Sequence, residues 1–148
     1  EIQACDWSSD VCSSDLMALP SQVRGCGPFP DCFPRLINWP ADPSEQAAAI
    51  ALYAALMADS SLDLIGARER LLIEGRFAGS ELFVRALATL RPDCRVYTAS
   101  AEADVSFGAL RLIEPSLVPQ GSLSPVQPLD RDLAAYRDEW FDDIEAFA

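Results

Sequence analysis

The sequence predicts an α/β fold with few strands and several helices, and three observations predict it. The chain has 148 residues, which is the length of one ordinary domain. Half of its residues are apolar, which is enough for a buried core. Short apolar runs alternate with longer segments of helical period along the chain, and this alternation is typical of layered α/β folds.

The first predicted helix begins at Asp42 and ends at Gly66. Asp42 can cap the first turn, Pro43 suits that turn, and Glu45 can reach back to the cap as in a capping box. Apolar residues cover most of the helix circumference, so we expect a buried helix rather than a surface helix.

Further strands and helices are predicted after Gly66. The run from Leu71 to Glu74 is short and apolar and precedes a glycine, as in a buried strand. Only two strands are clear from the sequence, so each of them would lie at an edge of the sheet with unpaired backbone groups. Such a sheet fits a fragment better than a complete domain. The predicted elements are a strand over 71–74, a loop over 76–79, a helix over 80–90, a strand over 94–97, a helix over 104–113, a loop over 116–128 with an edge strand near Val126, and a helix capped by Asp130 with an apolar stripe of Leu133, Tyr136, Trp140, Ile144 and Phe147.

Residues 1–16 are predicted to be a non-native or disordered tail. They contain a direct repeat, Ser-Ser-Asp-Val and Ser-Ser-Asp-Leu, and show neither helical nor strand periodicity. The string Val-Cys-Ser-Ser-Asp-Leu resembles the translation of a common sequencing-library adapter, and a native Ser/Asp linker is the alternative. We therefore expect the natural N-terminus to be missing. Residues 17–41 are predicted to be a Pro/Gly-rich loop, since six of the eleven prolines lie between Pro20 and Pro43.

Composition and charge exclude several functions. The net charge is 11 − 23 = −12, which argues against a nucleic-acid partner and an anionic membrane surface. The sequence has no His and no Lys, so His-based catalysis, His-ligated metal, a P-loop lysine and a Schiff-base lysine are excluded.

The five cysteines form no CxxC pair, and we expect reduced thiols rather than a Cys26–Cys32 disulfide. No uncharged, unbroken apolar run reaches the roughly 18–20 residues of a membrane span. Asp59 and Asp63, one helical turn apart, are expected to form a solvated stripe.

One segment has a pattern that can carry chemistry. From Ile73 the predicted strand runs into a turn with Gly75 and Gly79, and Ser80 then opens a helix. Such a turn lets backbone N–H groups approach a phosphate closely, and the helix N-terminus offers unpaired donors. Two glycines before a helix are more often plain turn and cap residues, so the pattern alone leaves both interpretations open.

From about residue 19 to residue 140 the chain resembles the C-terminal part of the FGGY family of carbohydrate kinases. No single motif is decisive, but the order and spacing together are fairly specific. The residues that carry the resemblance are Gly25 to Phe29, Ala49 to Tyr53, Leu62 to Gly66, Ile73 to Ala78, Leu82 to Ala88, Phe107 to Ala109, Tyr136 and Trp140.

The resemblance implies a partial actin-like, ribonuclease-H-like ATPase lobe, with residues 42–148 as the C-terminal lobe of a sugar kinase. ATP with Mg²⁺ would bind in a cleft against this lobe, and Gly75, Arg76, Gly79 and Ser80 are the candidate nucleotide-binding residues. Glu74 and Arg76 stand where many family members have glycine, so Arg76 would either pair with phosphate or crowd the turn. The sugar would be held mainly by the other lobe, and the catalytic Asp lies upstream, so no catalytic residue is predicted here.

The function expected on this basis is phosphoryl transfer from ATP to a hydroxyl of a ketose or polyol, by a cytoplasmic bacterial enzyme. The chain alone is expected to be inactive. The expected partners are the sugar and ATP, with no nucleic acid and no membrane, and a homodimer is left open. The alternative function is a non-catalytic α/β module that binds another protein.

The tail generates the first prediction. Deleting residues 1–16 should leave the midpoint of urea unfolding unchanged, because nothing in the segment has the period of a packed element. A loss of more than about 1 kcal/mol, the size of a typical mutational effect, would show that the segment belongs to the fold.

Overall fold

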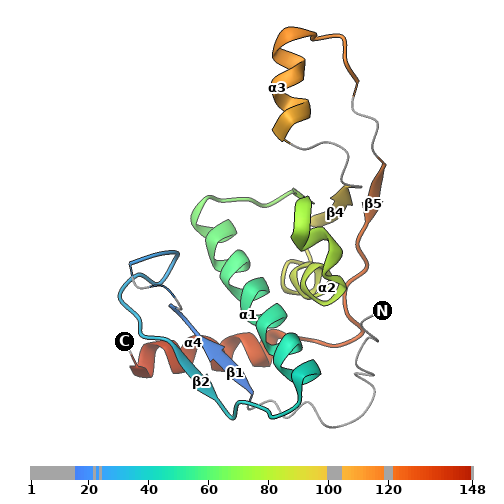
Figure 1. Ribbon diagram of the computed structural model, residues 1–148. Helices are drawn as coiled ribbons and strands as arrows, with labels where there is room; N and C mark the ends of the chain where they lie inside the picture. The colour runs from blue at the N-terminus through green and yellow to red at the C-terminus, as the bar shows by residue number, and fades with distance from the viewer. Residues whose placement is uncertain (1–15, 22, 24, 100–104, 119–121, 148) are drawn as a thin grey trace.

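The computed structural model describes residues 16–21, 23, 25–99, 105–118 and 122–147, without the side chains of residues 105–108. It confirms a mixed α/β fold with small sheets and several helices (Figure 1). Residues 1–15, which make up most of the predicted tail, lie outside the described residues. The elements are β1 (Met17–Leu19), β2 (Arg35–Ile37), α1 (Pro43–Leu64), β3 (Arg70–Ile73), the 3₁₀ helix η1 (Gly75–Gly79), α2 (Glu81–Leu90), β4 (Arg95–Ala99), α3 (Val105–Ile113), β5 (Leu123–Pro125) and α4 (Ala134–Phe147).

Helix α1 begins where the sequence predicts. The Asp42 carboxylate accepts hydrogen bonds from the backbone N–H groups of Ser44 and Glu45, at 3.0 and 3.1 Å. The Ser44 hydroxyl also donates to this carboxylate, and the hydrogen bonds hold the pKa of Asp42 below its usual value. After α1 the chain reverses at Gly66, whose φ of 69° is in the left-handed region that glycine adopts without strain.

The expectation of a fully buried α1 is only half right. One side of the helix is buried through Ala48, Ala49, Leu52, Ala55 and Leu56. The opposite side is open, and Ile50 and Leu64 are 56% and 75% exposed. By length and composition α1 is also apolar enough to cross a membrane when up to two charged residues are allowed, but a core helix of a soluble protein passes the same test. The helix is not an uncharged run of that length, because Asp59 and Asp63 lie in it. Here its buried side packs into the protein core.

Helix α1 lies at the centre of the molecule (Figure 1). On one side it contacts β1 of a two-stranded antiparallel ribbon, β1–β2, which α4 also covers. On its other side it packs along α2, which covers one face of the sheet β3–β4–β5. In that sheet β3 and β4 are parallel, and β5 pairs antiparallel with β4. One continuous hydrophobic core links the ribbon, α1, α2, α4, β3 and β4, whereas all three residues of β5 are exposed.

The segment 17–41, predicted to lack regular structure, contains both strands of the ribbon. All three residues of β1, Met17 to Leu19, are buried. Helix α4 fixes this strand through Trp140, which is fully buried and donates from Nε1 to the Ala18 carbonyl at 2.9 Å. The proline-rich residues between the strands do form a loop, as predicted, and Phe29 of that loop packs edge-on against Trp140 with ring centroids 5.4 Å apart.

Helix α4 corrects two further expectations. Its first turn is capped by Asp132, which accepts from the Ala134 N–H at 2.8 Å, and not by Asp130. The Tyr136 hydroxyl donates to the Leu16 carbonyl at 2.8 Å, so the last residue of the predicted tail does take part in the fold. The expectation that residues 1–16 contribute nothing is therefore wrong at Leu16, and an unchanged unfolding midpoint is expected only of a deletion that ends at residue 15.

The expected solvated stripe of Asp59 and Asp63 is wrong for Asp59, which is buried, whereas the Asp63 side chain is 50% exposed; both carboxylates bind Arg91. Arg91 Nη1 lies 2.6 Å from Asp59 Oδ1 and 3.0 Å from Asp63 Oδ1. The side chains of Arg91 and Asp59 are only 4% and 6% exposed. Arg91 also donates through Nη2 to the Ala67 carbonyl. Burial alone would lower the pKa of Arg91, but hydrogen bonds with Asp59, Cys94 and Asp63 outweigh it and raise that pKa above its ordinary value.

This ion pair generates the second prediction. Arg91→Ala should lower the free energy of unfolding by about 3–5 kcal/mol, because it leaves the Asp59 carboxylate buried without its cation. Arg68→Ala is the matched control, since Arg68 binds Asp63 at 3.1 Å on the exposed surface and should contribute at most about 1 kcal/mol. Equal losses in the two variants, measured by urea unfolding, would contradict the assignment.

Candidate functional site

The predicted candidate site lies at the carboxyl end of β3. Strand β3 ends at Ile73, η1 follows over Gly75–Gly79, and α2 begins at Glu81. The sequence predicts a loop over 76–79, whereas the structure has one turn of 3₁₀ helix closed by a 3.1 Å hydrogen bond from the Ser80 N–H to the Phe77 carbonyl. Since ligands of open α/β sheets bind outside the carboxyl ends of parallel strands, the turn lies at the edge where a ligand is expected.

Gly75 is required by the backbone at the start of this turn. Its φ of 67° lies in the left-handed region, which costs other residues roughly 1–2 kcal/mol. A Cβ atom built at Gly75 or at Gly79 meets no atom within 4 Å, so the space beside both glycines is open. The turn therefore presents its backbone to solvent on that side, which is the arrangement that a bound ligand needs.

Ser80 is the N-cap residue of α2, but its side chain makes no capping hydrogen bond. Its carbonyl accepts from the Val84 N–H at 3.1 Å and so starts the helical hydrogen-bond series. The first N–H groups of a helix have no intrahelical partner, and they form a site of positive potential. The uncapped start of α2 thus adds donors on the side of the turn.

The charges around the turn are mixed. Arg76 is exposed and positive, whereas Glu74 and Glu81 are exposed and negative. Glu81 is paired with Arg85 at 3.4 Å, one helical turn further on. Among the residues that the structure describes, neither Arg76 nor Glu74 has an ion-pair partner, so the turn offers one cation beside one carboxylate.

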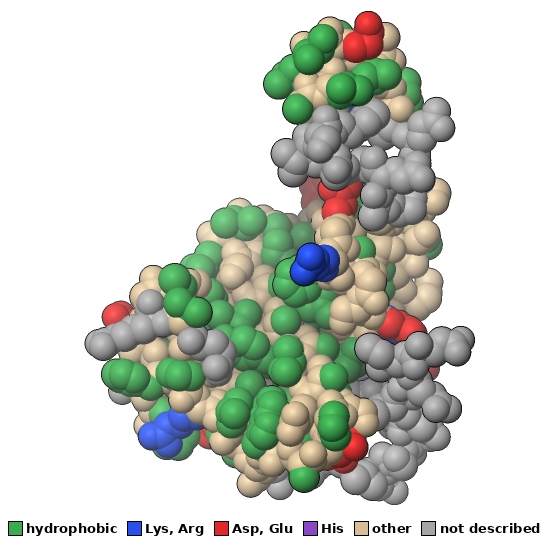
Figure 2. Space-filling model, viewed as in Figure 1, with side chains coloured by type: hydrophobic (Ala, Val, Ile, Leu, Met, Phe, Trp, Pro, Cys, Tyr) green, Lys and Arg blue, Asp and Glu red, His purple; other side chains and the backbone are tan. Residues whose placement is uncertain are grey.

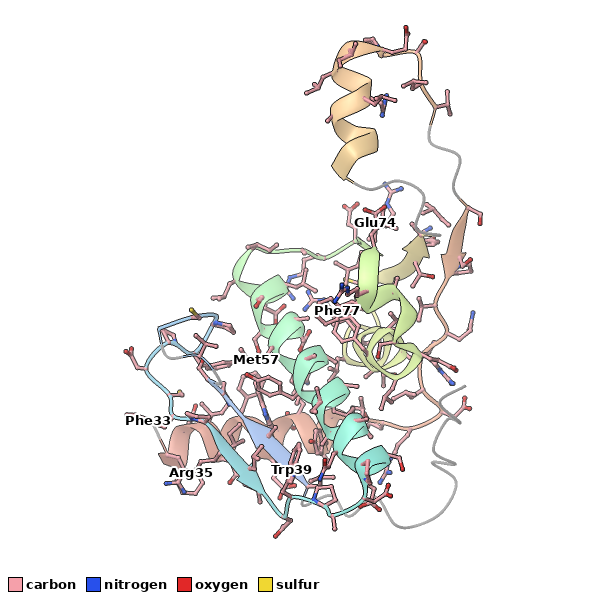
Figure 3. The ribbon with its side chains drawn as sticks, in the orientation of Figure 1. Phe33, Arg35, Trp39, Met57, Glu74 and Phe77 are labelled. Carbon is pink, nitrogen blue, oxygen red and sulfur yellow. The ribbon has the colours of Figure 1, made fainter. Side chains whose placement is uncertain are left out.

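Phe77 is a residue of the turn that the sequence reasoning did not single out. Its ring is more than half exposed, and its inner side packs against Phe83 of α2 with ring centroids 5.0 Å apart (Figure 3). A lone Phe in a glycine-containing turn gives no periodic signal, so the pattern of the sequence could not identify it. The structure thus brings the four predicted residues Gly75, Arg76, Gly79 and Ser80 into one turn and adds an aromatic surface to them.

The described residues contain no cluster of three carboxylate or thiol side chains that could hold a metal ion. Within that part of the chain Cys26, Cys32 and Cys94 are free thiols, so the turn and its surroundings supply neither a metal centre nor a disulfide. A magnesium ion that accompanies ATP needs no such cluster, because one or two carboxylates with phosphate oxygens and water usually hold it.

Comparison with known proteins shows the family. A family model described as the C-terminal domain of carbohydrate kinase FGGY matches residues 3–121. A solved structure of a carbohydrate kinase from Novosphingobium aromaticivorans is 55% identical to this chain and superposes on it with a TM-score of 0.80. A search of curated proteins gives no match. The chain belongs to the FGGY carbohydrate kinase family and corresponds to its C-terminal domain.

The two chains differ greatly in length. The similarity covers 88% of this chain but only 28% of the Novosphingobium kinase. The family match also includes most of residues 1–16, and the foreign origin of that segment stays a prediction.

The third prediction separates the two glycines of the turn. Gly75→Ala should lower the free energy of unfolding by about 1–2 kcal/mol, because alanine is strained at a φ of 67°. Gly79→Ala should have a much smaller effect, because Gly79 has no left-handed backbone and its Cβ position is open. If both variants unfold at the same urea concentration, the turn does not have this backbone geometry.

Proposed function

We propose that this chain is the nucleotide-side part of an ATP-dependent carbohydrate kinase that phosphorylates a hydroxyl group of a ketose or polyol. Membership of the FGGY family supports the kinase class. The observation that carries the nucleotide assignment is the open glycine turn, Gly75–Gly79, at the carboxyl end of a parallel strand and directly before an uncapped helix. The family match favours this function over the non-catalytic interaction module.

The turn fits a nucleotide through its backbone more than through its charges. The open space beside Gly75 and Gly79 allows close approach of a ligand, and the start of α2 supplies N–H donors. The negative charge of Glu74 repels a triphosphate, so phosphate binding at this turn depends on Arg76 and the N-terminus of α2. The uncharged ribose and base meet no such repulsion, and the exposed ring of Phe77 offers them an apolar contact. We therefore place the nucleoside end of ATP at this turn.

The chain by itself is proposed to be inactive. In phosphoryl transfer the sugar oxygen bonds to the γ-phosphorus, the bond to the ADP oxygen breaks, and a base takes the hydroxyl proton. We assign no base to the described residues, because the resemblance to the family places the catalytic Asp upstream of this chain. Asp59 is buried against Arg91 and Asp63 binds the same guanidinium, so these two carboxylates do not replace it. The base, the sugar site and any Mg²⁺ ligands are then contributed by other parts of the full-length kinase. A cytoplasmic, bacterial enzyme is part of the same proposal.

The fourth prediction tests the nucleotide site in the full-length kinase. Gly75→Val should raise the KM for ATP at least about tenfold, a loss of about 1.4 kcal/mol, while the KM for the sugar changes little. Gly66→Val is the matched control: Gly66 has nearly the same φ, 69°, and equally open surroundings, but lies at the end of α1 away from the turn. The two variants carry similar backbone strain. A higher KM for ATP in Gly75→Val than in Gly66→Val therefore indicates a ligand at the turn.

The same assay decides the role of Arg76. Weaker ATP binding by Arg76→Ala means that the guanidinium pairs with phosphate, and tighter binding means that its side chain crowds the turn. If Gly75→Val and Gly66→Val have the same KM for ATP in folded, active enzyme, the nucleotide binds elsewhere and the assignment is wrong.

A further inference from the structure

Two surfaces with exposed apolar side chains have no cover among the described residues. One is the outer face of the sheet β3–β4–β5. Side chains alternate between the two faces of a strand, so Leu71 and Val96 are buried on the side of α2, whereas Leu72 on the other side is 52% exposed. The same face also carries the exposed, paired Arg70 and Arg95, so it is mixed rather than purely apolar. Parallel strands are normally covered on both faces, but the described residues supply only one of these two layers.

The second surface is helix α3, which stands clear of the other helices (Figure 1). None of its described side chains belongs to the hydrophobic core. Leu112 and Ile113 are 86% and 84% exposed, and Leu110 is exposed as well. Figure 2 shows hydrophobic side chains over this helix at the top of the view.

The exposed side chains of α3 form one stripe. At about 100° per residue, Leu112, Ala109, Ile113 and Leu110 span an arc of about 160°, and Arg111 lies on the opposite side. A helix with such a stripe is amphipathic and packs this side onto another protein surface.

We infer that the apolar stripe of α3, formed by Ala109, Leu110, Leu112 and Ile113, docks against the part of the full-length kinase that lies outside residues 1–148. The inference rests on the proposed function. The similarity covers only 28% of the Novosphingobium kinase, so most of a kinase of that size is available to cover α3 and the outer face of β3. Because β3 and β4 are parallel, η1 and α3 follow strand ends at the same edge of the sheet. The docked helix then joins the edge that carries the nucleotide turn to the rest of the enzyme.

Two other occupants fit less well. A second copy of the chain would bring together two molecules with a net charge of −12 each, which repel. A transmembrane span fails on length, because nine helical residues span about 14 Å and the hydrocarbon core is about 30 Å thick. An amphipathic helix can also lie in the membrane interface, but a chain with a net charge of −12 is repelled by an anionic membrane surface.

The test uses thiol labelling of the full-length kinase with a maleimide, and the labelled cysteine is located by peptide mass spectrometry. The Leu112→Cys variant should react at least about tenfold more slowly in the native kinase than in the same protein unfolded in urea, because the docked stripe excludes the reagent. The Arg111→Cys variant is the matched control on the opposite side of α3 and should react at nearly equal rates in both states. Amide hydrogen exchange over residues 109–113 of the unsubstituted kinase tests the same docking without any substitution.

Each outcome decides the inference. Rapid labelling of Leu112→Cys in the native full-length kinase, with fast exchange of the same amides, overturns it. Protection that grows with protein concentration assigns the surface to a second copy, and equal protection in the isolated 148-residue chain assigns it to the chain itself; both overturn it. Sugar phosphorylation is measured separately. An active kinase with unprotected Leu112→Cys refutes only the docking, and a protected but inactive kinase refutes only the proposed function.

Discussion

The ion pair between Arg91 and Asp59 is the constraint on which the arrangement of the other elements depends. Arg91 ends α2, Asp59 lies in the last part of α1, and the Ala67 carbonyl that Arg91 also binds belongs to the segment just before β3. One guanidinium therefore fixes the end of two helices and the start of a strand. Since β3 is only four residues long, its start also sets the position of the turn that follows it.

The pair contributes more to the specificity of this arrangement than to its stability. Removing two charges from water costs several kcal/mol each, and their attraction in the interior repays this cost only with good geometry and further hydrogen bonds. Arg91 meets most of that condition through Asp59, Asp63 and Ala67, although its Nε has no hydrogen-bond partner among the described residues. An apolar pair of similar volume would pack there as well, but it would not select one position of α2 along α1.

The elements with local signals could be predicted from the sequence. The Asp-Pro-Ser-Glu start of α1, the apolar run of β3 and the Ser80 start of α2 each depend on residues close together in the chain, and the structure confirms them. The features that were missed depend on residues far apart. Strands β1 and β2 are three residues long and pair across a proline-rich loop, and the burial of Asp59 depends on a partner 32 residues further on. Neither pairing has a periodic pattern.

The candidate site shows the same difference between features with a local sequence signal and features that depend on distant residues. The glycine spacing and the helix start at Ser80 correctly place one exposed turn at a strand end, because Gly75 needs its left-handed φ whatever surrounds it. The exposed ring of Phe77 and the pairing of Glu81 with Arg85 become visible only when side chains are placed. The ring of Phe77 is the feature from which the nucleoside end of ATP is proposed at this turn, whereas the sequence pattern indicated only the approach of a phosphate to the backbone.

The open geometry of the turn also explains why this domain alone would not enclose a nucleotide. Small-molecule sites bury most of a ligand's surface, typically 70–90%. Here Gly75 and Gly79 face open space, and the glycines, Arg76 and Phe77 form a single exposed surface rather than a cavity. A nucleotide resting on it would keep its other side in water, where contacts are weak and a reactive phosphoryl group is open to hydrolysis. A second wall would be needed on the open side, and under the proposed function the rest of the full-length kinase would supply it. On the proposed function, the exposed turn, the face of β3 and the stripe of α3 that lack a cover among the described residues have one cause, the separation of this domain from the rest of the enzyme.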